Sequence, residues 1–181
     1  MKRVQRVAVS AFSSHGFDEV TVEQVAEGAG VSPISIYRWF GTKEAVVLWD
    51  EYDPPLFEAI GARLEASSPF DAVRDGLIAE LDRMYDSEQA LVLDRARLIV
   101  GEPVLLHASI SQQTAMVDGL VELFNAAGVD GGALEHRVLA GAAVGVLTVC
   151  LTHWAHDGGT VPMGELIGVA FETLRRAMCQ T

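Results

Sequence analysis

The chain has 181 residues, of which 50% are hydrophobic and 21% charged, a composition that indicates a globular protein with a sizeable core and excludes a disordered one. Its net charge of −12 argues against a general nucleic-acid binder. Residues 1–50 carry five Lys and Arg against six Asp and Glu, whereas the rest of the chain holds 8 against 19. The near-neutral N-terminal part could therefore face DNA while the acidic remainder turns away, although a solvated acidic surface explains the asymmetry equally well.

Compartment and cofactor use are indicated by the cysteines and by the longest apolar run. Cys150 and Cys179 have no CxxC spacing, which suits reduced thiols in a cytosolic protein better than a disulfide or a zinc site. The most apolar run, residues 138–151, is too short to cross a bilayer and is interpreted as a buried helix. We therefore expect a cytoplasmic protein with no cofactor, no structural metal and no membrane contact.

A first helix is predicted over residues 2–14, with one apolar face. Three cations, Lys2, Arg3 and Arg6, lie near its start. Contact with DNA phosphate and simple solubility of a chain terminus are equally good explanations for them.

Residues 21–44, TVEQVAEGAGVSPISIYRWFGTKE, contain three helix start signals in succession. Thr21 is a predicted N-cap with a glutamine three residues on as its capping-box partner. Ser32 before Pro33 is the second start, and Thr42 is the third. Three starts with no strand signal between them predict a helix-turn-helix.

The short helix that begins at Pro33 is the predicted DNA-reading helix. Its N-terminal residues, Pro33, Ile34 and Ser35, are candidates for the major groove, where only Ser35 can donate or accept a hydrogen bond. Tyr37 and Lys43 are placed to meet phosphates. The predicted DNA contacts are Thr21, Ser32, Pro33, Ile34, Ser35, Tyr37, Arg38, Trp39 and Lys43.

The helix that begins at Lys43 is predicted to run to about Asp53, where it meets the pair Pro54-Pro55. Either it kinks there or a new helix starts. In a later helix from Pro103, an apolar stripe that includes Leu106, Ile110, Gln113 and Met116 is expected to face inward. Further helices are predicted over residues 71–85, 88–100, 103–125, 133–155 and 162–177.

The predicted fold class is all-α, with two parts. Residues 1–45 form a DNA-binding head, and residues 46–181 form a body for ligand binding and dimerisation. The helix from Lys43 to about Asp53 is expected to couple ligand binding in the body to the position of the head.

Two arginines of the body, Arg95 and Arg97, alternate with apolar residues, so at least one is expected near buried surface. Paired with Asp94 or Glu102, such an arginine would be structural. Alternatively, its guanidinium could bind an anionic group of an effector.

Small apolar residues over 140–145 would let neighbouring helices approach closely, which suggests a dimer seam. The last helix would complete an antiparallel four-helix interface with the same pair from a partner chain. An ordinary buried core helix would have the same composition. The predicted interface residues are Gly141, Gly145, Leu166, Val169 and Thr173.

The motif Thr-x-x-Gln-Val-Ala-x-x-Ala-Gly-Val-Ser at 21–32, with Ile36-Tyr37-x-Trp39-Phe40 and Thr42-Lys43-Glu44, resembles the DNA-binding domain of the TetR (tetracycline repressor) family. The resemblance covers roughly residues 4–48. It implies an all-helical homodimer, usually a repressor, that releases a palindromic operator when a small molecule enters the C-terminal domain. Trp39 stands where the family often has Tyr or His, and an aromatic core is an equally good place for its indole.

Three segments, Trp49-Asp50-Glu51-Tyr52-Asp53-Pro54, Arg95-Ala96-Arg97-Leu98-Ile99 and His153-Trp154, resemble a TetR subgroup whose C-terminal domain binds acyl-coenzyme-A-like ligands. The resemblance implies a small apolar or acyl-CoA-like effector. The candidate ligand-binding residues are Trp49, Tyr52, Tyr85, Arg95, Arg97, Gln113, Met116, His153 and Trp154.

No catalytic motif of the GxSxG, Walker or HExxH type occurs in the chain, so no enzyme activity is predicted. The sequence predicts a ligand-responsive transcriptional regulator that binds a double-stranded DNA operator as a homodimer. A single head has few charges, so the affinity for the operator must come largely from the two heads of a dimer binding together. The alternative is a helical ligand-binding or interaction protein without operator-specific DNA binding, which the acidic balance keeps open.

Overall fold

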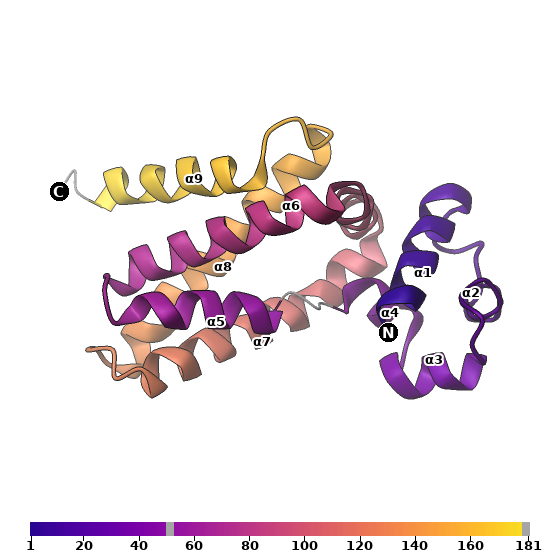
Figure 1. The fold of residues 1–181 in the computed structure, drawn as a ribbon, viewed down its shortest axis with the longest axis horizontal. Helices are drawn as coiled ribbons and strands as arrows, with labels where there is room; N and C mark the ends of the chain where they lie inside the picture. The colour runs from indigo at the N-terminus through magenta and orange to yellow at the C-terminus, as the bar shows by residue number, and fades with distance from the viewer. Residues whose placement is uncertain (50–52, 179–181) are drawn as a thin grey trace. The chain divides into compact units, whose positions relative to one another are not determined.

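The structure is a computed structural model that describes residues 1–49 and 53–178, apart from the side chains of residues 53, 84–87 and 178. All regular structure within these residues is helical (Figure 1), as the sequence predicts. The helices are α1 (Lys2–His15), α2 (Val22–Ala29), α3 (Pro33–Phe40), α4 (Lys43–Leu48), α5 (Asp53–Leu64), α6 (Pro69–Gly101), α7 (Pro103–Ala126), α8 (Ala133–His156) and α9 (Met163–Met178).

The three predicted start signals of the head are confirmed as N-caps. Thr21 Oγ1 accepts a hydrogen bond from the Gln24 backbone N–H at 3.3 Å, and the Gln24 side chain accepts one from the Thr21 N–H at 2.8 Å. Ser32 Oγ caps α3, and Thr42 Oγ1 caps α4. Each cap supplies an acceptor for an N–H that the first helical turn leaves without a partner, so these helix starts are fixed locally.

The last helix of the head, which begins at Lys43, is shorter than predicted. Helix α4 ends at Leu48, and α5 begins at Asp53 with Pro54 and Pro55 in its first turn. Of the two alternatives that the proline pair left open, the new helix is therefore the observed one, because a first-turn proline has no hydrogen bond to lose. The predicted ligand residue Tyr52 lies outside the described residues.

Helix α6 contains a break close to the predicted boundary between two helices. Glu88 has φ −145° and ψ 25°, which is not helical, so the two predicted helices are the two parts of α6. The residue that caps α6 is Ser68 rather than Asp71, because the Asp71 N–H donates to Ser68 Oγ at 3.2 Å. Asp71 therefore sits in the first turn, where its carboxylate is favoured by the helix dipole.

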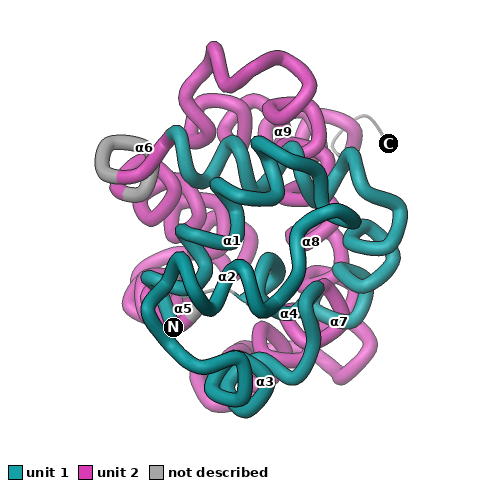
Figure 2. The backbone as a smooth tube through the Cα atoms, turned by 90° about the vertical axis from the view of Figure 1, so that its right-hand side faces the viewer, with its two compact units in different colours: residues 1–51, 90–112 teal, residues 52–89, 113–181 magenta. Residues whose placement is uncertain are grey.

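The chain divides into two compact units (Figure 2): residues 1–51 with 90–112, and residues 52–89 with 113–181. The core of the first unit gathers the apolar faces of α1 to α4 around Phe12, Val25 and Ile36, and it includes Leu98 of α6 and Leu105 of α7. The two units are defined by which residues pack together. The predicted boundary between residues 45 and 46 instead separates a DNA-binding part from a ligand-binding part, and it stays a prediction.

The phase of the apolar stripe on α7 differs from the prediction at its start. Leu106 and Ile110 are exposed, whereas Leu105 and Ser109 are buried. The helix has apolar residues on several faces, so periodicity alone does not select the inward one.

In the second unit, helices α8 and α9 pack against each other. Trp154 is fully buried, and its indole Nε1–H donates to the Val161 carbonyl at 2.9 Å. Cys150 is a buried free thiol whose pKa is raised by burial. Cys179 lies outside the described residues.

Helix α8, Ala133–His156, matches the helix predicted over residues 133–155 but is less buried than expected. Its 24 residues are long and apolar enough to span a membrane by length and composition, and only 33% of the most apolar window is buried. The expectation that this segment is too short to cross a bilayer is therefore wrong, because the run over residues 138–151 leaves out the apolar residues at both ends of the helix. Core helices of soluble proteins meet the same criterion, so it carries little weight here.

Candidate functional site

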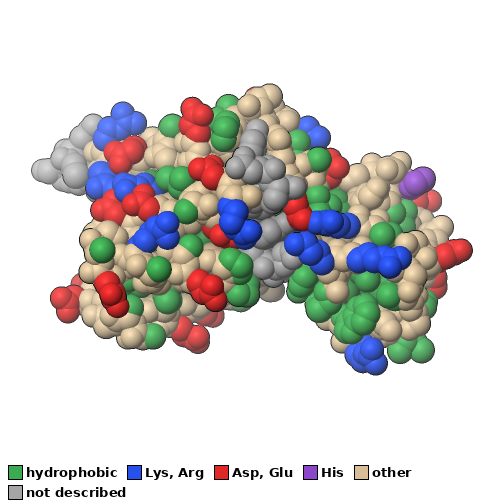
Figure 3. All heavy atoms as spheres, viewed as in Figure 1, with side chains coloured by type: hydrophobic (Ala, Val, Ile, Leu, Met, Phe, Trp, Pro, Cys, Tyr) green, Lys and Arg blue, Asp and Glu red, His purple; other side chains and the backbone are tan. Residues whose placement is uncertain are grey.

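Helix α3 presents large side chains to solvent. Ile34 is 77% exposed, Tyr37 48% and Trp39 38%, although each could contribute to a core. Hydrophobic side chains lie at the surface of the part that contains α3, with a Lys or Arg among them (Figure 3). This exposed apolar area suits a surface that contacts a partner, because folding of the single chain alone would favour burying these side chains.

The polar residues at the start of α3 are already paired with each other. Ser32 Oγ accepts from the Ser35 backbone N–H at 3.2 Å, and the two hydroxyl oxygens are 3.0 Å apart. Ser32 is exposed, whereas Ser35 and Pro33 are partly buried. Base readout by Ser35 would therefore use the remaining hydrogen-bonding capacity of a hydroxyl that is held in place by the cap.

The three further candidates are Thr21, which caps α2, Lys43, which begins α4, and Arg38, which belongs to α3 itself. Thr21 is exposed at the start of α2, and the Arg38 guanidinium lies 6.0 Å from the Trp39 ring centroid. The Lys43 ammonium donates to the Phe17 carbonyl and lies 4.3 Å from the centroid of the Phe17 ring. An ammonium has three donors, so a phosphate contact by Lys43 remains a prediction.

An arginine of α1 lies beside the turn that joins α2 to α3. Gly30 has φ +64°, which favours glycine, and a Cβ placed on it would lie 3.1 Å from Arg3 Nη2. Among the three cations of the first helix, Arg3 is thus brought to the helix-turn-helix.

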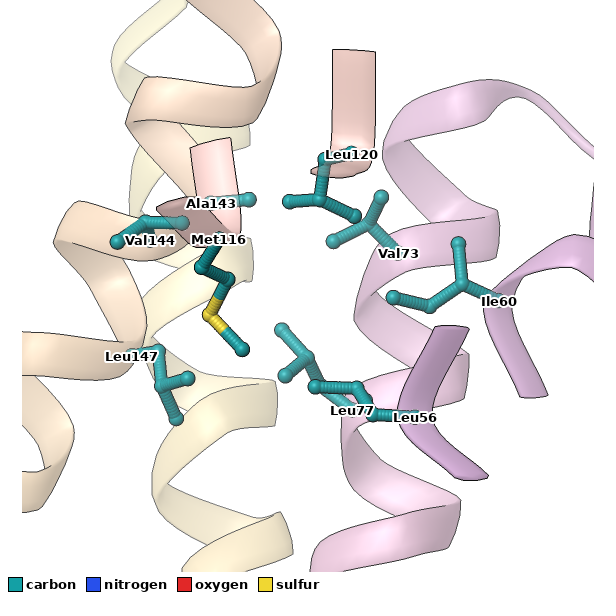
Figure 4. Close-up of a pocket in the computed structure, with 9 residues that line it drawn as sticks. All are labelled: Leu56, Ile60, Val73, Leu77, Met116, Leu120, Ala143, Val144 and Leu147. Atoms are coloured by element: carbon teal, nitrogen blue, oxygen red, sulfur yellow. The ribbon is translucent and has the colours of Figure 1, made fainter. Parts of the chain in front are cut away.

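The second unit contains a small apolar cavity (Figure 4). The cavity measures about 10 Å³, which is room for about one water molecule. Met116 reaches into the space between the α8 side chains Val144 and Leu147 on one side and Leu77 on the other. The lining residues are Leu56, Ile60, Val73, Leu77, Met116, Leu120, Ala143, Val144 and Leu147.

Of the candidate ligand residues, only Met116 lines this cavity. Trp154 is used in the core, His153 is exposed, and Gln113 is partly buried on α7. The side chain of Tyr85 is outside the described residues. The other lining residues were missed because an aliphatic residue at helical spacing reads the same whether it lines a cavity or fills a core.

The aromatic and cationic candidates of the first unit make contacts within it. The Trp49 ring packs edge-on against Phe40, with the centroids 6.1 Å apart. Arg97 is exposed, and its Nη1 lies 3.8 Å from Asp94 Oδ1, the structural alternative that the sequence allowed.

The contacts described for Arg95 are hydrogen bonds to backbone carbonyls of α4. Its Nε donates to the Val47 carbonyl at 2.8 Å and its Nη2 to the Leu48 carbonyl at 3.0 Å. This guanidinium therefore caps the C-terminal end of α4, where carbonyls lack helical partners and the helix dipole favours a cation.

An exposed apolar stripe follows α8 at helical spacing. Leu134, Val138 and Val149 are 75%, 61% and 66% exposed. Gly141 and Gly145 lie on the same stripe, and a Cβ placed on either would meet no atom within 4 Å. On α9, Val169 and Thr173 are exposed and Leu166 is partly buried.

Two family models match the chain. Residues 6–48 match the model described as "Bacterial regulatory proteins, tetR family", and residues 67–179 match the model described as "MftR C-terminal domain". The two matches cover most of both compact units.

Full-length relatives resemble the chain over most of its length. It is 26% identical over 176 residues to Mycobacterium tuberculosis MftR, which is named provisionally as a mycofactocin biosynthesis transcriptional regulator; the match covers 94% of this chain and 87% of that one. It is 31% identical over 133 residues to the HTH-type transcriptional regulator TcmR of Streptomyces glaucescens, which covers 69% of this chain and 59% of TcmR.

A solved structure shares the fold. The crystal structure of Thermus thermophilus FadR, a transcriptional repressor in complex with lauroyl-CoA, superposes with a TM-score of 0.64. The sequences are 21% identical, and the superposition covers 99% of this chain and 95% of that one.

Proposed function

Because this chain belongs to the TetR family of bacterial regulatory proteins, we propose that it is a homodimeric repressor that leaves a palindromic operator when an acyl-CoA-like effector enters its body. It is a ligand-responsive, DNA-binding transcriptional regulator. The observation that carries the proposal is the capped helix α3 with its exposed Ile34, Tyr37 and Trp39.

We assign base readout to the N-terminal end of α3. Ile34 and Pro33 offer apolar contact to thymine methyl groups, and Ser35 offers a hydroxyl. Phosphate contacts are assigned to Tyr37, Lys43 and Arg3, with Arg3 supported by its position at Gly30. Thr21, Ser32, Arg38 and Trp39 complete the proposed DNA surface. Two such heads would meet successive major grooves about 34–36 Å apart.

The dimer is assigned to the exposed stripe of α8 with the exposed residues of α9. Glycines at the centre of such a stripe permit close helix approach, and TetR regulators work as dimers. Burial in a dimer also explains why α8 is so apolar without any membrane. We place the protein in the cytoplasm, and a non-enzymatic role agrees with relatives that are named transcriptional regulators.

The effector site is assigned to the cavity at Met116. Its lining is entirely aliphatic apart from the thioether, so an alkyl chain suits it, and the related fold of FadR binds lauroyl-CoA. The cavity is far smaller than a typical ligand pocket of roughly 300–1,000 Å³, so binding requires Met116 and its neighbours to move. Methionine suits that task because its side chain is flexible.

A gel-shift titration of the DNA upstream of the protein's own gene, over a salt series, tests the DNA-binding part. We expect sequence-preferring binding that weakens steeply with salt. Binding that shows neither property favours the alternative, a helical ligand-binding protein without operator recognition.

The effector part is tested by adding lauroyl-CoA, free coenzyme A or laurate to the preformed complex. We expect release by lauroyl-CoA and none by coenzyme A alone. Met116→Trp should fill the cavity and abolish release while retaining operator binding. Leu106→Trp is the matched control, because Leu106 is an exposed residue of the same helix. Equal release from both variants would place the effector elsewhere.

A further inference from the structure

The C-terminal end of α4 is held by side chains from three other helices. The carbonyls of Val46, Val47 and Leu48 have no partners within the helix. Gln5 of α1 donates to Val46 O and Val47 O, each at 3.2 Å. Arg95 of α6 donates to Val47 O and Leu48 O.

A second donor reaches Leu48 from α7. Gln112 Nε2 donates to the Leu48 carbonyl, so this oxygen accepts from both Arg95 and Gln112. Gln5 is buried within the head, whereas Arg95 and Gln112 come from helices that also run into the second compact unit. These last two donors therefore connect the head's α4 to helices of the body.

The two donors sit at points where movement of the body would reach them. Arg95 lies beyond the non-helical Glu88, where α6 can change direction. Gln112 lies one turn before Met116 on the uninterrupted helix α7, and Met116 reaches into the small cavity. The Met116 side chain can move by itself for a small ligand, whereas a longer alkyl chain that needs more room also shifts this part of α7, and the Gln112 amide moves with it.

We propose that Arg95 and Gln112 form a latch on the α4 C-terminal carbonyls, and that they are positioning residues for the effector response. The closed latch and the small cavity belong to one state, which binds operator. An effector enlarges the cavity, draws Gln112 from Leu48 and frees α4. The inference rests on the proposed function for its biological meaning, and it replaces direct effector binding by Arg95.

The latch can be cut without leaving an unpaired carbonyl. In Arg95→Ala, Val47 O keeps Gln5 and Leu48 O keeps Gln112; in Gln112→Ala, Leu48 O keeps Arg95. Each single variant should therefore fold. Matched controls are Arg97→Ala, an exposed arginine two residues along the same helix, and Gln89→Ala, whose amide donates to the Gly159 carbonyl instead.

The test measures lauroyl-CoA binding, operator binding and uptake of the apolar dye N-phenyl-1-naphthylamine by each purified variant. Gln112→Ala loses one hydrogen bond to α4, and Arg95→Ala loses two. One lost hydrogen bond shifts the equilibrium toward the open state by about three- to tenfold, so lauroyl-CoA and dye should bind tighter by that factor in Gln112→Ala and by at least that factor in Arg95→Ala. Operator affinity without effector should fall by less, because the closed state still predominates. Both controls should match the unaltered protein.

Adding Met116→Trp to Gln112→Ala should remove the gain in dye binding, which separates cavity opening from general loosening. Unchanged binding in both latch variants would overturn the inference, and so would weaker binding of operator and lauroyl-CoA together with a lower melting temperature. If the unaltered protein binds no operator, the proposed function fails, whereas the dye still reports whether the latch closes the cavity.

Discussion

Gly76 on α6 marks a close approach to the backbone of α5 in the body. A Cβ placed there would lie 3.0 Å from the backbone N and Cα of Ile60 on α5. Backbone atoms cannot turn aside as a side chain can, so Gly76→Ala should lower the free energy of unfolding by about 1–3 kcal/mol. Urea denaturation would measure the loss.

Gly101 provides the control for this substitution. It ends the same helix, and a Cβ placed on it meets no atom within 4 Å. Gly101→Ala should leave the unfolding free energy nearly unchanged, and equal losses in the two variants would show that the α5–α6 approach is not tight.

Asp71 joins α6 to α9 through a small ionic network. Its carboxylate accepts from Ser68 Oγ at 2.7 Å, pairs with Arg175, and lies 2.7 Å from Arg74 Nη1. The Ser68 hydrogen bond, followed by that of Arg175, lowers the pKa of Asp71 below its ordinary value of 3.8. The folded state therefore binds this proton less readily than the unfolded state.

The stabilisation from Asp71 should be present above pH 4 and lost as the pH falls through the lowered pKa. We expect Asp71→Asn to cost at most about 1 kcal/mol at pH 7, because the carboxylate is partly solvated, and less at pH 2. Unfolding curves at both pH values test this. Asp94→Asn, which removes the long contact with Arg97, should show a smaller effect at either pH.

Residue roles could be predicted only where the partner is close in sequence. The Thr21–Gln24 and Ser32–Ser35 pairs follow from their spacing. Arg95 could not be assigned, because its partners lie 47 and 48 residues away on a different helix. No local pattern encodes a contact of that separation.

For whole helices, cap residues and prolines predicted the helix starts better than apolar periodicity predicted the buried faces. Cap residues located the starts of α2, α3 and α4, and Pro54-Pro55 marked a new helix. Periodicity misplaced the inward face of α7, where Leu106 and Ile110 are exposed. It also could not distinguish an aliphatic cavity from a filled core, so only Met116 of the lining was named.

Helix α3 is the element on which sequence preference should depend. Ile34 is 77% exposed, so its truncation leaves the head core intact. We expect Ile34→Ala to weaken binding to the preferred operator roughly three- to tenfold while leaving binding to unrelated DNA unchanged. Fluorescence anisotropy with both DNAs measures the ratio.

The control for α3 is Val104→Ala, which trims an exposed aliphatic residue of α7. It should alter neither affinity. If Ile34→Ala weakened binding to both DNAs equally, α3 would contribute general adhesion and base readout would have to come from elsewhere.

For the whole molecule, affinity should depend on pairing of two protomers. Gly141 and Gly145 face open space, so Gly145→Arg does not clash within its own protomer. A long cation on the proposed seam should separate the chains, and loss of the second head should weaken operator binding at least about 100-fold. For Gly145→Arg and the unaltered protein, analytical ultracentrifugation measures the oligomeric state, gel shifts measure operator affinity, and circular dichroism checks that the helices remain folded.

Gly101→Arg adds the same charge at a position that is also open but distant from the stripe in sequence. It should remain dimeric and bind operator normally. A dimeric Gly145→Arg variant would move the seam away from the centre of α8.

The core of the head has a consequence for exchanging parts between regulators. Leu98 and Leu105, from segments far along the chain, belong to the same buried cluster as Phe12 and Ile36. A graft cut after residue 48 would leave that cluster incomplete and apolar surface uncovered. A chimeric regulator that borrows this operator preference should therefore carry residues 90–112 with the head, which makes the transferable module a discontinuous one.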